Sequence, residues 1–140
     1  MEFVTDRTLA DVQQGTAKGS YSYEDLNRVE SAVKKLSRLA AALDVYYEPI
    51  TKTDWAERPG VFSADTWPTI SQMQRYLQNV SDLCTAIEIK ADLPRSMEDL
   101  DWQGANRIEE ALQAVDIRVH SILQAFQYSG ELFAGEECCI

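Results

Sequence analysis

Apolar residues recur three or four positions apart in three long segments of the chain. The first segment carries Leu26, Val29, Val33, Leu36, Ala40 and Leu43. The second carries Ile70, Met73, Leu77, Val80, Cys84 and Ile87, and the third carries Trp102, Ala105, Ile108, Leu112, Val115, Val119, Ile122 and Phe126. This spacing predicts three long amphipathic α-helices, whose apolar faces bury one another in a bundle.

Capping residues predict where these helices begin. Ser22 is the expected N-cap of the first helix, and Thr69 with Gln72 forms a capping-box pattern at the start of the second. The third helix is expected to start at Asp99 or Asp101. The second helix should end near Ala91, ahead of Pro94, because the residue before a proline disfavours helical geometry.

A shorter helix is expected near the N-terminus, from about Asp6 to Gln14, where Gly15 and Gly19 would stop it. We therefore predict one all-α domain over residues 1–140. Residues 1–20 form an N-terminal arm with the short helix, residues 21–128 form the bundle of three long helices, and residues 129–140 form a C-terminal tail. Alternating residues also suggest a minor two-stranded β-hairpin made from segments 48–55 and 128–135.

Charged residues are expected on the outer faces of these helices. Glu24 with Arg28 and Glu30 with Lys34 are spaced four apart, in the order that stabilises an exposed helix. The paired carboxylates in "EDLD" (98–101) and "RIEEAL" (107–112) lack the Glu-x-x-His spacing of di-iron sites, and we interpret them as caps and solvated faces.

The connection from residue 46 to residue 67 is unusually rich in aromatic residues. Its aromatic residues are Tyr46, Tyr47, Trp55, Phe62 and Trp67. Two interpretations follow: these rings cover one open side of the core, or they form an interaction surface for a partner, since Tyr and Trp are enriched at interface hot spots.

Composition narrows the classes of function. Thirteen Lys and Arg against 23 Asp and Glu give a formal net charge of −10, which disfavours binding to nucleic acid or to an anionic membrane. The chain begins without the pattern of a signal peptide, and no run of 18 apolar residues predicts a membrane span. Three cysteines are too few and too irregularly placed to predict a disulfide framework.

No catalytic, cofactor or metal site is predicted. His120 is the single histidine and is expected at the surface, while Cys84 lies on an apolar stripe and is expected to be buried. Cys138 and Cys139 are adjacent and lack the spacing of zinc ligands. A metal-dependent hydrolase would have to bind its ion at these cysteines or at His120. The basic residues Lys34, Lys35 and Arg38 predict either a solvated surface or contact with an acidic patch on a partner.

Several segments of the chain form a recognisable series, which begins with "TDRTLADV" at the N-terminus. It continues with "DLNRVE" at 25–30, "YLxNV" at 76–80, "WxxANxIE" at 102–109 and "SGExxxGE" at 129–136. With these four as its recurrent features, the series resembles, over nearly the whole chain, a helical domain of prophage and phage proteins of Gram-positive bacteria, found in tail or baseplate genes or as an appended module.

The resemblance implies a non-enzymatic virion or assembly component without a cofactor. Its partners would be other phage structural proteins or further copies of itself, and it would reside in the bacterial cytoplasm during assembly and in the virion afterwards. The alternative is a cytosolic helical adaptor or regulator that binds a host or phage protein.

Overall fold

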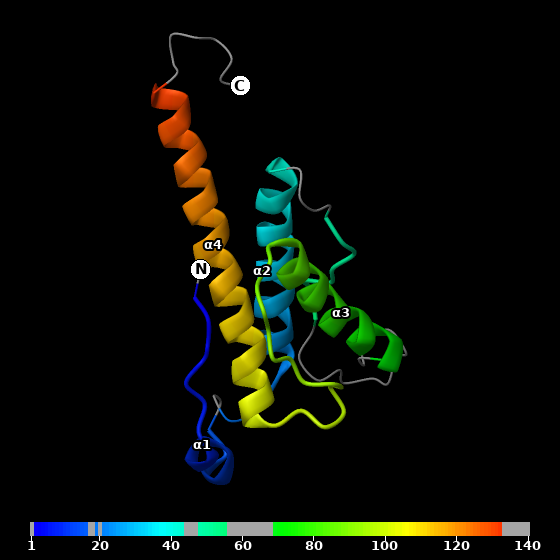
Figure 1. Cartoon of the computed structure of the whole chain (residues 1–140). Coiled ribbons are helices and arrows are strands. Elements are labelled where there is room, and N and C mark those ends of the chain that lie inside the picture. The colour runs from blue at the N-terminus through cyan, green and yellow to red at the C-terminus, as the bar shows by residue number, and fades with distance from the viewer. Residues whose placement is uncertain (1, 17–18, 20, 44–47, 56–68, 133–140) are drawn as a thin grey trace.

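Four α-helices are present in the residues that the computed structural model describes, 2–16, 19, 21–43, 48–55 and 69–132. They are α1 (Leu9–Gln14), α2 (Tyr23–Ala42), α3 (Ile70–Ala86) and α4 (Trp102–Leu132). The three long helices contact one another, and no strand is present in these described ranges (Figure 1). The predicted all-α bundle is therefore confirmed.

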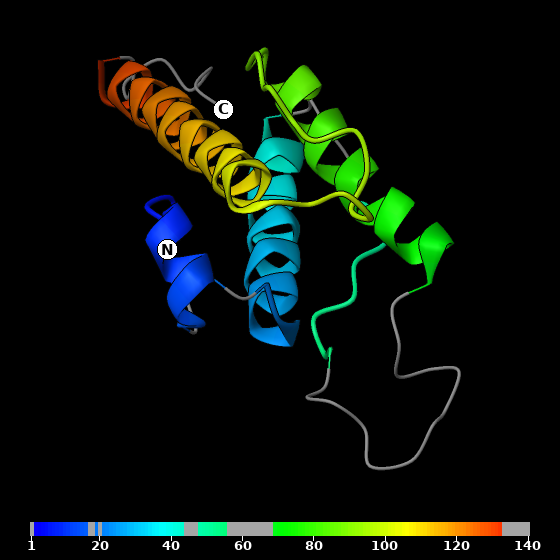
Figure 2. The ribbon, with the colours of Figure 1, turned by 90° about the horizontal axis from the view of Figure 1, so that it is seen from below.

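Two of the long helices share one direction. Figure 1 shows that α2 and α4 begin at the same end of the bundle and run the same way, while α3 crosses them obliquely. Seen from that end, α1 and α3 lie on opposite sides of α2 (Figure 2). With 31 residues against 20, α4 is about 46 Å long and α2 about 30 Å. The C-terminal part of α4 consequently extends beyond α2.

The helix starts follow the capping residues. Ser22 accepts a hydrogen bond from the Glu24 N–H, and the Asp25 carboxylate accepts one from the Ser22 N–H. Thr69 and Gln72 make the reciprocal pair of a capping box at the start of α3. Asp101 accepts a bond of 2.7 Å from the Gly104 N–H, so of the two predicted caps for α4 it is Asp101 that serves. These bonds satisfy backbone donors that have no partner inside the helix.

Most residues of the predicted apolar stripes meet in one core, but Ile70 is 65 % exposed, and Leu83 joins the core although it was not on a predicted stripe. The most buried aliphatic residues of the core, each at most 1 % exposed, are Val29, Val33, Leu36, Ala40, Val80, Leu83, Ile108, Leu112, Val115 and Val119. Each long helix contributes to this set, so no helix can be removed without exposing the stripes of the other two. The hydrophobic effect therefore supports the three helices as one unit.

The predicted β-hairpin is wrong. Residues 48–55 contain no strand, and residues 128–132 are the last residues of α4, while residues 133–135 lie outside the described part. Side chains instead bond several polar backbone groups of segment 48–55: Asn27 and Glu30 accept from the N–H groups of Trp55 and Lys52, and Asn79 donates to the Ile50 carbonyl. Each of these groups therefore has a partner without a neighbouring strand.

Three helix boundaries also differ from the prediction. α1 begins at Leu9 rather than Asp6, because Thr8 is its N-cap. α3 ends at Ala86, five residues before Ala91, and Glu88 just beyond it has a positive φ of 61° that ends the helix. α4 continues to Leu132, so the bundle region extends past the predicted limit at residue 128.

Replacing Trp55 by Ala should lower the free energy of unfolding by about 3 to 5 kcal/mol, because its ring is only 4 % exposed and packs in the core. Trp55→Phe keeps most of the packing but removes the bond from the indole N–H to Glu30, and should cost about 1.5 to 3 kcal/mol.

Urea unfolding of the purified variants measures both changes. Ile50→Ala is the control, since Ile50 lies in the same segment and is 80 % exposed, and it should change stability by less than about 0.5 kcal/mol. Equal effects of the two alanine substitutions would contradict the buried position of Trp55.

Candidate functional site

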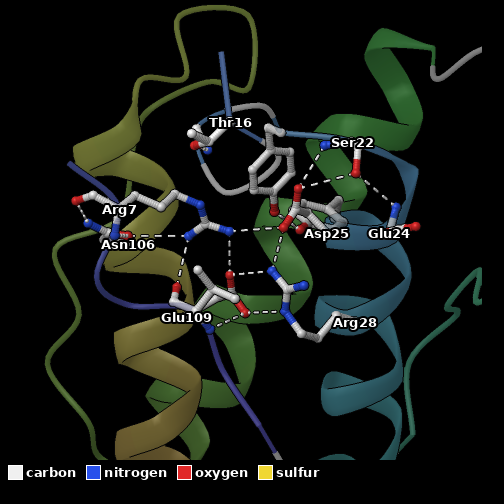
Figure 3. Close-up of polar contacts among 12 residues, drawn as sticks. Arg7, Thr16, Ser22, Glu24, Asp25, Arg28, Asn106 and Glu109 are labelled. Carbon is white, nitrogen blue, oxygen red and sulfur yellow. Dashed lines mark hydrogen bonds and ion pairs between the residues drawn. The ribbon is translucent and has the colours of Figure 1, made fainter. Parts of the chain in front are cut away.

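Four charged side chains form a buried cluster where the N-terminal arm meets α2 and α4 (Figure 3). The Arg7 side chain is 2 % exposed, and its Nη2 lies 3.0 Å from Asp25 Oδ1 and 2.6 Å from Glu109 Oε2. Arg28 bonds the same two carboxylates, with Nε 2.6 Å from Glu109 Oε1 and Nη2 against Asp25. We call these four residues the arginine–carboxylate cluster.

The cluster also binds the backbone of the N-terminal arm. Asn106 on α4 accepts a bond of 3.1 Å from the Arg7 N–H and donates one of 3.0 Å to the Arg7 carbonyl. Glu109 accepts a further bond from the Val4 N–H. The arm is thus held to α4 by polar side chains as well as by the half-buried Phe3.

The charges within the cluster cancel, because two guanidinium groups face two carboxylates. The hydrogen bonds that Arg28 donates to Glu109 raise the pKa of this guanidinium above its ordinary value, which keeps it charged. Glu109 is 0 % exposed, and each of its oxygens already accepts a bond from an arginine. A carboxylate with these bonds is suited to holding three elements together.

A second buried glutamate fixes segment 48–55 to the bundle. Glu30 on α2 is 1 % exposed, and its Oε1 lies 2.6 Å from Arg75 Nη1 on α3. It also accepts bonds from the Lys52 N–H and the Trp55 indole N–H. Beside it, Asn27 donates to the Trp55 carbonyl at 2.8 Å and accepts from the Trp55 N–H at 2.7 Å.

These two clusters correct the predicted surface charges. Glu30 pairs with Arg75 across the bundle rather than with Lys34, and Arg28 pairs with Asp25 and Glu109 rather than with Glu24. Glu109 is buried, whereas a solvated face was expected for it.

The spacing of the sequence could have predicted that the side chains of Glu30 and Glu109 are buried. Glu30 lies four residues after Leu26, and Glu109 lies four residues after Ala105 and three before Leu112, so each glutamate shares a helix face with stripe residues.

A pair of tyrosine hydroxyls joins the chain just before α2 to α3. Tyr21 and Tyr76 share a hydrogen bond between their hydroxyl oxygens, and either oxygen could donate. Burial raises the pKa of both hydroxyls above the ordinary value for tyrosine. Because each hydroxyl is easier to bury neutral than charged, the pair favours the protonated state throughout the neutral range.

An open pocket of about 900 Å³ lies between α3 and the connection that leads to α4. Met73 and Leu77 line it from α3, and Leu93, Met97 and Leu100 line it from the connection. Two of the three methionines of the chain therefore face one pocket. Methionine is common at surfaces that adapt to a partner, because its unbranched side chain fits irregular shapes.

The outer face of α3 beside this pocket is free of charge. Between Thr69 and Ser81 the one charged residue is Arg75, whose guanidinium bonds Glu30. Ile70 is 65 % exposed, and the exposed Gln74 and Gln78 also line the pocket. Charged residues make up 26 % of the chain, so an uncharged face of this length is unusual for it. Depletion of charge is typical of the centre of a protein–protein interface.

Of the five aromatic residues of the predicted interaction surface, only Trp55 lies within the described residues. Trp55 is buried in the core, in agreement with the interpretation that its ring covers the helices, and it is not exposed on the surface of the chain. Tyr46, Tyr47, Phe62 and Trp67 lie outside the described residues. The pocket was not predicted, since it arises from the packing of the α3–α4 connection against α3. The uncharged face of α3 was not predicted either, although the sequence between Thr69 and Ser81 contains its signal, because Arg75 is the one charged residue there.

The other candidate residues occupy ordinary positions. Cys84 is 2 % exposed as predicted, and burial raises the pKa of its thiol to about 11. His120 is exposed and its Nδ1 lies 2.9 Å from Asp116 Oδ1 on the same helix. Cys138 and Cys139 lie outside the described residues. Among the residues that the structure describes, no group of three or more His, Cys, Asp or Glu could hold a metal ion. None of the described helices is both long and apolar enough to cross a membrane.

The segments that carry the sequence resemblance supply most of these polar contacts. Arg7 belongs to "TDRTLADV", Asp25, Arg28 and Glu30 belong to "DLNRVE", and Glu109 belongs to "WxxANxIE". Tyr76 and Asn79 of "YLxNV" make the tyrosine pair and the bond to the Ile50 carbonyl. In this structure the residues of these segments therefore fasten the arm and the connecting segment to the bundle.

Glu109→Gln should lower the free energy of unfolding by about 3 to 5 kcal/mol, because it leaves the buried guanidinium of Arg7 and the partly buried one of Arg28 facing a single carboxylate. Glu110→Gln makes the same chemical change at the neighbouring, exposed position and should alter stability by less than about 0.5 kcal/mol. Urea unfolding at neutral pH compares the two variants. A similar small effect of both would show that the cluster does not support the fold.

The tyrosine pair should make the fold sensitive to alkali. The unfolded hydroxyls ionise near pH 10, whereas the native pKa values are higher, so their contribution is complete below pH 10 and is lost as the pH rises toward the native values. Above pH 10 the free energy of unfolding should fall by up to about 1.4 kcal/mol per pH unit for each hydroxyl. Urea unfolding between pH 9 and about pH 11 should show a shallower decline in Tyr76→Phe. Parallel declines of the two proteins would contradict this assignment.

No protein-family model, curated protein or solved structure matches this chain. The function is therefore argued from the geometry of the site.

Proposed function

We propose that the chain is a non-enzymatic structural or assembly module of a prophage-encoded particle, a tail or baseplate component that acts through protein–protein contacts. The sequence resemblance supports the phage setting. The geometry supports the mode of action, and the observation that carries it is the uncharged face of α3 beside an open apolar pocket.

The hydrogen bonds and ion pairs among the buried charged groups support the same proposal. Arg7, Asp25, Arg28 and Glu109 bond one another, and Glu30 bonds Arg75 together with two N–H groups. These bonds fix the arm and segment 48–55 to the helices. A rigid support of this kind presents a binding face with little loss of conformational freedom on association, which favours affinity.

Particle composition tests the proposal. Particles released after induction of the lysogen that encodes the chain are purified and digested, with the soluble lysate as control. Peptides such as "YLQNVSDLCTAIEIK", residues 76–90, should be enriched in the particles at a stoichiometry close to that of other tail proteins. Their confinement to the soluble fraction would overturn the virion role and favour the cytosolic adaptor.

A further inference from the structure

The pocket between α3 and the α3–α4 connection has the dimensions of a helix-binding groove. Its lining on α3 runs from Thr69 to Ser81, which is about 18 Å along the helix axis. Apolar residues line both walls, with Met73 and Leu77 opposite the connection residues Leu93 and Met97. Grooves of this kind receive the apolar face of an amphipathic helix, whose anchor residues recur at three- and four-residue spacing.

The charge around the pocket indicates the kind of helix. Residues 81–101 carry six acidic residues, which are Asp82, Glu88, Asp92, Glu98, Asp99 and Asp101, against the two basic residues Lys90 and Arg95. One acidic and one basic residue, Glu98 and Arg95, line the pocket itself, so its acidic character comes from the residues around it. Asp82 follows Ser81 at the far end, and Asp99 and Asp101 flank Leu100, which lines the pocket. A partner with basic residues beside its apolar anchors would complement this charge, whereas an acidic partner would be repelled.

The charge of the chain also makes a second copy of it a less favourable occupant of the pocket. Each copy carries a formal net charge of −10, so the approach of another copy to an acidic rim is opposed by repulsion between like charges. A basic segment of a different protein experiences attraction at the same place.

We infer that this pocket binds an amphipathic helix of a partner protein, with its apolar residues between Met73 and Met97 and its Lys or Arg residues facing Glu98 and Asp82. The inference rests on the proposed function, because it names the kind of partner that the module would contact. The exposed Ile70 and Gln74 lie at the pocket and would meet this helix.

Two synthetic peptides of about 14 residues, long enough to span the pocket as a helix, test the inference. Both carry leucines at three- and four-residue spacing, and their polar faces carry lysines in one peptide and glutamates in the other. Fluorescence anisotropy of labelled peptides with the full chain at physiological ionic strength should show at least tenfold tighter binding of the lysine peptide. Equal affinity for both peptides, or no binding of the lysine peptide, would overturn the inference.

Matched variants locate the binding. Ile70→Ser removes an apolar side chain at the pocket, and Ile117→Ser removes one with nearly the same exposure on α4, 67 % against 65 %. Gln74→Arg places a positive charge at the pocket, and Gln113→Arg places one at an exposed position of α4. The two pocket variants should weaken binding of the lysine peptide about tenfold or more, and the two α4 variants should leave it unchanged. Equal effects of each matched pair would show non-specific attraction and reject the pocket.

Self-association is measured on the same proteins by sedimentation over a range of concentrations. A dimer that Ile70→Ser disrupts would assign the pocket to a second copy and overturn the partner helix. Failure of the peptide test together with enrichment of the chain in particles would reject the helix-binding pocket but leave the proposed function intact. Peptide binding by a chain that is confined to the soluble fraction would support the helix-binding pocket but reject the proposed role in the particle.

Discussion

The bonds of Glu109 to two arginines are the interaction on which the arrangement of the chain depends. This carboxylate is fully buried, yet it connects α4 to Arg28 on α2 and to Arg7 in the N-terminal arm. Desolvating several charges is costly, and the attraction between them offsets this cost only when nearly every polar atom has a partner. The cluster therefore stabilises one position of the arm and disfavours alternatives in which an arginine or a carboxylate is left unpaired.

Glu30 applies the same constraint on the other side of α2. An extended segment without regular structure would normally expose its N–H and C=O groups to water or pair with a strand. Here Asn27, Glu30 and Asn79 bond several of those backbone groups, and the indole N–H of Trp55 also donates to Glu30. The helices thus provide both the apolar core and the polar groups that hold the irregular segments against it.

The local features could be predicted from the sequence, whereas the long-range polar contacts could not. The stripes and the caps at Ser22 and Thr69 depend on residues within one or two helical turns, so their spacing is sufficient to predict them. The partner of Glu30 is Arg75, 45 residues away, and spacing within α2 favoured Lys34 instead. The hairpin prediction failed for the same reason, since alternation in segment 48–55 does not show that side chains of α2 and α3 bond its backbone.

The distribution of charge connects the fold to the proposed binding face. In most soluble proteins the charged residues lie outside and the apolar residues inside. In this chain Arg7, Glu30 and Glu109 are buried, while the exposed residues of α3 between Thr69 and Ser81 are uncharged. Arg75 links the two observations, because it bonds Glu30 in the interior and thereby leaves the outer face of α3 without charge. The same ion pair that fixes segment 48–55 thus also makes the surface beside the pocket suitable for an apolar partner.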